Sequence, residues 1–290
     1  MRRLVLFAAV ALILGSVAIA LSMRPSTLPA EMTEAEPFMF GVIADPHVGT
    51  DDIDVQGNNN TVRLQLALEW LANEKVKFVI LTGDIVHGMH RCRIVEGEWI
   101  AYAEAVNRSL PLYTVKGDHE IYNDLYCKYT GNMKGYTVAA GGFTFLFMSD
   151  WNQENKATSN KTWTFDGEQL AWLETQLKTA SQPVIMVGHM TLLPGPKVLT
   201  GDLQAYCDLI RGNILLHLAG HNHSTVFRNV SGVVEYSPQS LSCTPSWQRE
   251  DLGDVLPVSI LTVADSDLRI TQYDVYSGQP MDSWTVPLTA

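Results

Sequence analysis

The chain has 290 residues, of which 46% are hydrophobic and 18% are charged, a composition typical of globular proteins. This length predicts one large domain or two small ones, with a core big enough to be stable without a disulfide scaffold. The formal net charge of −11 excludes a broad basic surface for nucleic-acid backbones and disfavours electrostatic docking to anionic lipid.

Residues 1–22 differ from the rest of the chain. Arg2 and Arg3 precede a nearly continuous apolar run over 4–21, which is close to the ~20 residues that a membrane-spanning helix needs. We interpret this segment as a signal peptide with a small-x-small cleavage site at 18–20. A retained single-pass membrane anchor is the alternative.

Residues 23–36 are interpreted as a short linker with two prolines. Residues 37–290 contain no linker-like stretch and are expected to form one domain. With either interpretation of the N-terminus this domain is exported, and is then secreted, periplasmic or anchored to the outer face of a membrane. Membrane contact is expected only through the N-terminal segment, and the sequence does not predict an oligomeric state.

Short apolar runs alternate with amphipathic stretches from residue 37 onward, a pattern typical of βα units. The runs are rich in Val, Ile, Leu and Phe, as fully buried strands are. Strands are predicted at 38–44, 78–82, 112–116, 184–187 and 214–219. Helices are predicted at 62–72, 97–109 and 167–180. Asp166 is expected to cap the last helix, and the alternation over 255–287 predicts antiparallel strands.

The four cysteines form an even set with no CxxC spacing: Cys92, Cys127, Cys207 and Cys243. In an oxidising compartment they allow three disulfide pairings. We favour Cys92 with Cys127, because each follows a loop that carries candidate site residues at a similar distance. Four buried free thiols are the alternative.

Every one of the five apolar runs ends in a loop that carries an Asp or a His. The loops are Asp45-Pro46-His47, Gly83-Asp84, Gly117-Asp118-His119-Glu120, Gly188-His189 and Gly220-His221-Asn222-His223. Because ligands bind outside the carboxyl ends of the strands in open α/β sheets, these loops are expected to converge on one crevice. In four of them a glycine comes first, where the backbone turns sharply or approaches another group closely.

Carboxylates and imidazoles without thiolates are suited to Mn, Fe or Zn. Seven residues are candidate ligands: Asp45, His47, Asp84, Asp118, His189, His221 and His223. This is too many for one ion and enough for two ions that share a bridging carboxylate. Two ions ~3.5–4 Å apart lower the pKa of a bridging water toward ~7 and stabilise both oxygens of an in-line displacement at phosphorus. The set therefore predicts hydrolysis of small phosphate esters.

The five blocks, in the order D-x-H, GD, G-D-H-E, GH and GH-x-H, resemble those of the calcineurin-like metallophosphoesterases. The resemblance covers roughly residues 38–224 and includes the stretch Gln169-Leu170-Ala171-Trp172-Leu173. It implies an α/β fold, a two-sheet sandwich of mixed strands flanked by helices, which agrees with the antiparallel C-terminal part predicted above. The stretch 83–88 is most similar to the phosphodiesterase branch of the family.

The resemblance also implies roles for single residues. The first metal would be held by Asp45, His47 and His223, and the second by Asp118, His189 and His221. Asp84 would bridge the two ions. His119 would contact the phosphate and stabilise or protonate the leaving oxygen.

Asp118 departs from the family pattern, which has Asn at this position. A carboxylate still binds metal, but it adds a negative charge beside an anionic substrate. We expect tighter metal binding and a lower rate. The alternative function is therefore a catalytically weak or inactive binding protein with the metallophosphoesterase fold.

Several other polar residues have simpler interpretations. His217 is expected to be a core histidine, and Glu120 to support the site from outside it or to cap a helix. We favour a solvated loop for His87 and His90, with substrate contact as the alternative. The acidic residues Asp51, Asp52 and Asp54 are interpreted as a solvated face.

Overall fold

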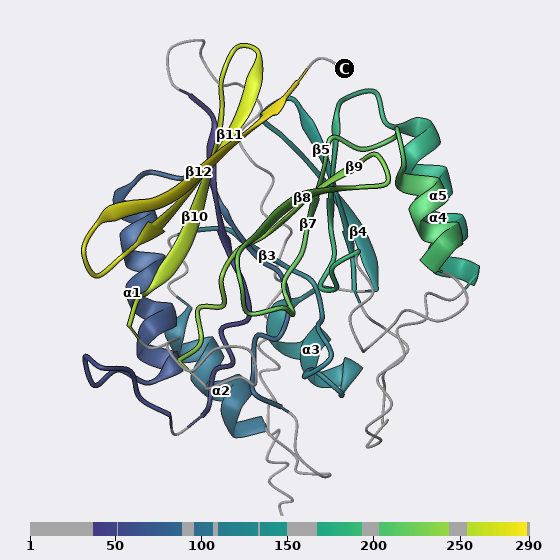
Figure 1. The fold of residues 1–290 in the computed structure, drawn as a ribbon. Coiled ribbons are helices and arrows are strands. Elements are labelled where there is room, and N and C mark those ends of the chain that lie inside the picture. Colours follow the sequence, from purple (N-terminus) through teal and green to yellow (C-terminus); the bar gives the residue numbers. More distant parts are fainter. Residues whose placement is uncertain are drawn as a thin grey trace, which may run out of the picture.

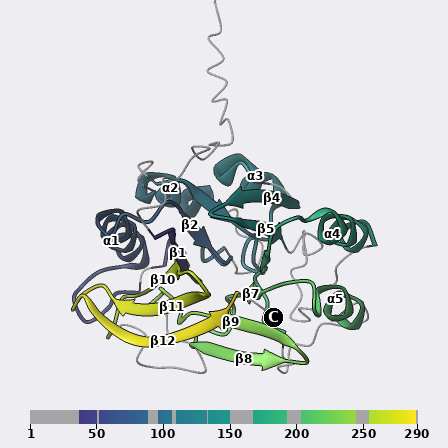
Figure 2. The same cartoon turned by 90° about the horizontal axis from the view of Figure 1, so that it is seen from above.

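Two six-stranded sheets stand face to face in the computed structural model, with helices on their outer sides (Figures 1 and 2). The structure describes residues 37–50, 52–88, 96–106, 110–132, 134–149, 167–192, 203–243 and 254–288. The predicted leader and linker lie outside these ranges, as does Asp166. Within the ranges, no helix is both long enough and apolar enough to cross a bilayer.

The first sheet has the strand order β12-β11-β10-β1-β2-β3. Its strands are β1 (Met39–Ile43), β2 (Val79–Leu81), β3 (Leu112–Thr114), β10 (Pro257–Val263), β11 (Asp267–Asp274) and β12 (Gln279–Pro287). β1, β2 and β3 are parallel, whereas β10, β11 and β12 form an antiparallel meander that joins the sheet beside β1. The antiparallel C-terminal part predicted from the sequence is therefore confirmed.

The second sheet has the strand order β4-β5-β6-β7-β9-β8. Its strands are β4 (Gly135–Ala140), β5 (Phe143–Met148), β6 (Val184–Val187), β7 (Leu216–Leu218), β8 (Val226–Val230) and β9 (Val233–Ser237). β5, β6, β7 and β9 are parallel, and the hairpins β4–β5 and β8–β9 are antiparallel. Together the sheets form the mixed-strand sandwich that the sequence predicts.

Five helices lie on the described part of the chain: α1 (Asn60–Asn73), α2 (Glu96–Ala105), α3 (Asn123–Thr130), α4 (Gly167–Thr179) and α5 (Leu203–Ile210). Three of them were predicted within a few residues of their observed bounds, and α3 and α5 were not predicted. α1 begins where the side chain of Asn59 accepts a hydrogen bond from the amide of Val62, which satisfies one of the free donors of the first turn.

Successive residues of β1 and β2 alternate between two cores. Phe40 of β1 and Phe78, beside β2, face the second sheet, where both pack edge-on against Phe145 of β5 with ring centroids 5.1 and 5.4 Å apart. Ile43 and Leu81 face α1 and α2 instead. Because these strands are buried on both faces, they read as continuous apolar runs and their polar residues fall only beyond their ends.

The cysteines of the described chain, Cys127, Cys207 and Cys243, are free thiols. The favoured bridge between Cys92 and Cys127 involves Cys92, which lies outside the described residues. Cys127 is half-buried in α3 and packs against the hydrophobic cluster beneath α1 and α2.

The interpretation of Asp54 as part of a solvated face is wrong. Asp54 is buried and lies 2.6 Å from the guanidinium of Arg63, which is also buried, and it accepts the hydroxyl of Tyr276. Arg63 donates in addition to the carbonyls of Leu241 and Val255, at 2.8 and 2.6 Å. The pair thus ties α1 to two distant segments, a role that local acidic composition does not indicate.

Removal of the Arg63 side chain is expected to leave the Asp54 carboxylate buried without its counter-charge. Arg63→Ala should therefore lower the free energy of unfolding by about 3–5 kcal/mol, measured by denaturant titration. The matched control is Lys178→Ala, which breaks an exposed pair with Glu174 and should cost about 0.5 kcal/mol or less. Equal effects of the two substitutions would contradict the structural role given to the buried pair.

Candidate metal centre

The loops that carry the predicted ligands meet at one end of the two sheets. They follow β1, β2 and β3 in the first sheet and β6 and β7 in the second, and these strands are parallel within each sheet. Backbone hydrogen bonds join neighbouring loops. The amide of His47 donates to the carbonyl of Asp84 at 2.9 Å, and the amide of Gly220 donates to the carbonyl of His189 at 2.8 Å.

Two groups of side chains at this end could each surround an ion. One group is Asp84, Asp118, His189 and His221, and the other is His47, Asp84 and His223. Within each group the ligand atoms all lie within 4.8 Å of one another. Six of the seven predicted ligands are brought together in this way, and Asp84 belongs to both groups.

The first group is held together by short contacts around Asp118 and His189. His189 Nε2 lies 3.2 Å from Asp84 Oδ2 and 3.3 Å from Asp118 Oδ1, and His221 Nδ1 lies 3.2 Å from the same Asp118 oxygen. In the second group, the Nε2 atoms of His47 and His223 are 3.1 Å apart. Ligand atoms ~2.0–2.2 Å from a common ion are about 3–3.5 Å apart, so both groups fit a metal.

Asp45, the seventh predicted ligand, lies beside the two groups and belongs to neither. Its Oδ1 accepts the amide of His221 at 2.9 Å, and its Oδ2 is buried and has no hydrogen-bond partner among the described residues. Burial raises the pKa of Asp45 to about 8, the nearby Asp84 adds to the shift, and His189 opposes it. A buried oxygen of this kind is suited to a cation.

The electrostatics of the centre favour bound positive charge. Burial alone would raise the pKa of Asp84 and lower that of His189, but their mutual attraction reverses both shifts, so that the pKa of Asp84 is well below and that of His189 well above its usual value. Burial lowers the pKa of His47 strongly and that of His223 to about 4. These two imidazoles are neutral near pH 7, which is the form that binds metal.

Left-handed backbone conformations are concentrated in these loops. Among the described residues other than glycine, seven have positive φ, and five of the seven are predicted ligands: Asp45, His47, Asp84, His221 and His223. Such conformations cost free energy and persist where the surroundings impose them, most often at functional sites.

The glycines before the ligands allow the loops to pack closely. A Cβ atom at Gly117 would overlap Asp84 Oδ1 and would lie 2.5 Å from the Asp84 amide nitrogen. At Gly83, where φ is +95°, a Cβ would lie 2.5 Å from Nδ1 of His189. The close approach expected from the sequence is therefore observed at both positions.

Glu120 supports the centre from outside the ligand groups, which is one of the two roles expected from the sequence. Its buried carboxylate accepts the amides of Gly117, Asp84 and Val86 at 2.7, 3.1 and 3.1 Å. Burial, together with the charge of Asp84, raises the pKa of Glu120 to about 8. This side chain therefore fixes the backbone of two ligand loops relative to each other.

His119 lies at the rim of the centre. Its amide donates to Asp84 Oδ1 at 2.9 Å, and its Nε2 is 3.9 Å from Asp84 Oδ2. Its side chain is 15% exposed, whereas that of Asp84 is only 2% exposed. His119 can therefore contact both the buried ligands and a molecule that arrives from solvent.

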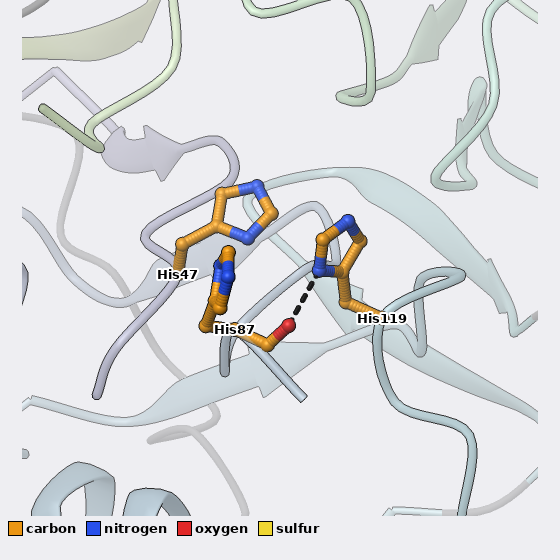
Figure 3. A group of neighbouring side chains, drawn as sticks. All are labelled: His47, His87 and His119. Atoms are coloured by element: carbon orange, nitrogen blue, oxygen red, sulfur yellow. Dashed lines mark hydrogen bonds between the residues drawn. The ribbon is translucent and has the colours of Figure 1, made fainter. Parts of the chain in front are cut away.

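The structure settles the placement of two further histidines. His217 is buried in β7, 3.2 Å from the carboxylate of Glu235, and is the core histidine that the sequence predicts. His87 does not lie on an open loop, as we favoured, but packs with its ring centroid 5.7 Å from that of His47 and 5.6 Å from that of His119 (Figure 3). His90 and Asp51 lie outside the described residues.

A sequence model of the calcineurin-like phosphoesterases matches residues 38–225. The chain belongs to this family. Among curated proteins, it is 30% identical to the serine/threonine-protein phosphatase CPPED1 of Pongo abelii and of Homo sapiens over 185 residues. That match covers 55% of this chain and 58% of each relative, so the similarity spans a little over half the length of either protein.

Solved structures of low sequence identity share the phosphoesterase fold. A dimetal phosphatase from Danio rerio is 16% identical with a TM-score of 0.69, and the match covers 88% of this chain and all of that one. GAP50, described as the anchor in the inner membrane complex of Plasmodium, is 12% identical with a TM-score of 0.62, with 88% and 90% covered. These likenesses establish the architecture only.

Substitution of Gly117 is expected to disturb the phosphoesterase centre without disturbing the rest of the fold. Gly117→Ala should weaken metal binding by about 10–100-fold, because the added methyl group displaces Asp84. The measurement is metal uptake by chelator-treated protein. Gly97→Ala is the control, since a Cβ there meets no atom within 4 Å. Unchanged affinity in Gly117→Ala would show that the Asp84 loop is not constrained as described.

Proposed function

We propose that the protein is an exported phosphoesterase that depends on two transition-metal ions and hydrolyses small phosphate monoesters or diesters. The observation that carries the proposal is the position of Asp84, whose carboxylate belongs to both ligand groups. Family membership supports phosphate-ester hydrolysis as the reaction class. Export rests on the composition of residues 1–22.

In the proposed centre, two sets of three residues would hold the ions, and Asp84 would be a ligand of both. One set is Asp45, His47 and His223, and the other is Asp118, His189 and His221. When bound, a pair of Mn, Fe or Zn ions supplies Lewis-acid stabilisation of phosphoryl oxygens and lowers the pKa of a coordinated water. Carboxylate and imidazole ligands are suited to all three metals.

His119 is the residue we propose to assist departure of the leaving group. Its Nδ1 lies 2.6 Å from the carbonyl oxygen of His87 and donates a hydrogen bond to it. The other ring nitrogen, Nε2, is left to face the centre. In the proposed role, Nε2 of His119 would donate a proton to the leaving oxygen. A general acid held at the rim in this way needs no movement of the buried ligands.

The alternative function is a binding protein that keeps the fold and the metals but turns over poorly. Asp118 is the residue that favours it. Its buried carboxylate contacts both His189 and His221, and two hydrogen bonds from these residues outweigh burial and hold its pKa well below the usual value. The charge that Asp118 adds therefore persists at neutral pH, where it repels an anionic substrate.

Hydrolysis is tested with chelator-treated protein reloaded with Mn, Fe or Zn. We expect metal-dependent cleavage of p-nitrophenyl phosphate or bis-p-nitrophenyl phosphate, and the preferred compound separates monoesterase from diesterase activity. Asp84→Asn should lower kcat by more than about 100-fold, since disturbing the groups outside a metal's ligands already costs about 10–100-fold. Lys178→Ala serves as the surface control. Full metal loading without cleavage of either ester would favour the binding protein.

The effect of the Asp118 charge is tested by Asp118→Asn in the same assay. We expect the amide to bind the metals about tenfold less tightly and to raise kcat, because it removes a negative charge from beside the substrate. Metal content and initial rates are measured together. An unchanged metal content with an unchanged rate would show that this position does not control turnover.

A further inference from the structure

A third group of potential ligands lies next to the two that share Asp84. It consists of His47, His87 and His119, whose ligand atoms all lie within 4.8 Å of one another. The ring centroids of His47 and His119 are 4.4 Å apart, and Figure 3 shows the three rings gathered around one space. This group contains three imidazoles and no carboxylate, unlike the other two.

Backbone hydrogen bonds help to fix His87 in this position. Its amide donates to the carbonyl of Val48 at 2.9 Å, and its carbonyl lies 2.6 Å from Nδ1 of His119. The next amide, that of Gly88, donates to Glu98 at 2.6 Å. Gly88 has a φ of +49°, and a Cβ there would overlap the carbonyl oxygen of His119. A substitution of His87 therefore leaves these anchoring contacts in place.

From this arrangement we infer that His47, His87 and His119 form an additional metal position, which takes a late divalent transition metal such as Zn²⁺ or Cu²⁺. Three imidazoles suit these ions, whereas Mn²⁺ and Mg²⁺ prefer oxygen ligands. Since Nδ1 of His119 is engaged with the His87 carbonyl, Nε2 is its ligand atom. His87 and His119 are half-buried, so the ion enters from the solvent side.

Occupation of this position inhibits the enzyme. His47 belongs both to the three-histidine group and to the group with Asp84 and His223, so an ion at the additional position lies next to the pair. The same ion occupies Nε2 of His119, the proposed donor to the leaving oxygen. This inhibitory effect rests on the proposed function, whereas the binding of the ion does not.

The binding test compares chelator-treated wild-type protein with His87→Asn. Zn²⁺ is added under equilibrium dialysis, and bound metal is measured by elemental analysis. Wild type should bind one more equivalent of Zn²⁺ than the variant, whereas both should bind equal amounts of Mn²⁺. Electron paramagnetic resonance of Cu²⁺-loaded wild type should show an additional imidazole-bound copper that His87→Asn lacks.

A second variant separates ligation from folding. His87→Cys supplies a thiolate, which also binds Zn²⁺, at the same position, so it should keep the additional Zn²⁺ equivalent that His87→Asn loses. In the ester assay, the Zn²⁺ concentration that halves the rate should rise by about tenfold or more in His87→Asn.

Two results would overturn the inference. If wild type and both variants bind the same number of Zn²⁺ ions, there is no additional position. If His87→Asn loses the ions of the pair as well, His87 is a ligand of the pair. If the protein hydrolyses neither ester, the proposed function fails, but the dialysis and resonance measurements still decide whether the position exists.

Discussion

The carboxylate of Asp84 is buried between two sets of imidazoles, and the surrounding loops are arranged about it. Its Oδ2 lies 3.2 Å from His189 and 3.8 Å from His47, and its Oδ1 accepts the amide of His119. An ionised carboxylate in the interior requires opposite charge and hydrogen bonds to be stable. The hydrogen-bond donors and imidazoles around Asp84 supply part of this stabilisation, and the same side chains could also bind cations.

The fold maintains this arrangement against considerable local cost. Left-handed φ values at five ligand residues and the close approach of Gly117 to Asp84 are both unfavourable in an isolated loop. They persist because each loop begins at the end of a strand that is packed on both faces, and because the carboxylate of Glu120 binds the amides of two loops. Rigid strands therefore supply the precision that a metal centre requires.

Three histidines lie side by side at the centre, and they differ in the interactions that position them. His47 is neutral and buried, His119 is oriented by the carbonyl of His87, and the backbone amide of His87 donates to the carbonyl of Val48. A group of imidazoles beside mixed imidazole and carboxylate groups gives the protein positions of different metal preference within one site. On this proposal, the three-histidine group would influence which metal binds and how an excess of metal affects the protein, in addition to the ligands of the buried ion pair.

The sequence by itself indicated the strands of the parallel cores, three helices and seven candidate ligands, because polar residues that follow buried strands stand out against apolar runs. The structure brings six of these candidates into two groups. Neither the strands β4, β5, β8 and β9 nor the helices α3 and α5 were predicted; of these, β4 and β8 are only partly buried and α3 is short. The interpretations of Asp54 as solvated and of His87 as a residue of an open loop were wrong for the same reason.

Only the tertiary structure decided where such residues lie relative to partners far along the chain. Asp54 is buried beside Arg63 of α1, which supplies its counter-charge, and His87 packs against His47 and His119, which lie on two other loops. Sequence patterns report how well a segment suits burial or exposure. The order of the strands and the packing of the two sheets decide which loops come together. No local sequence pattern encodes either of these.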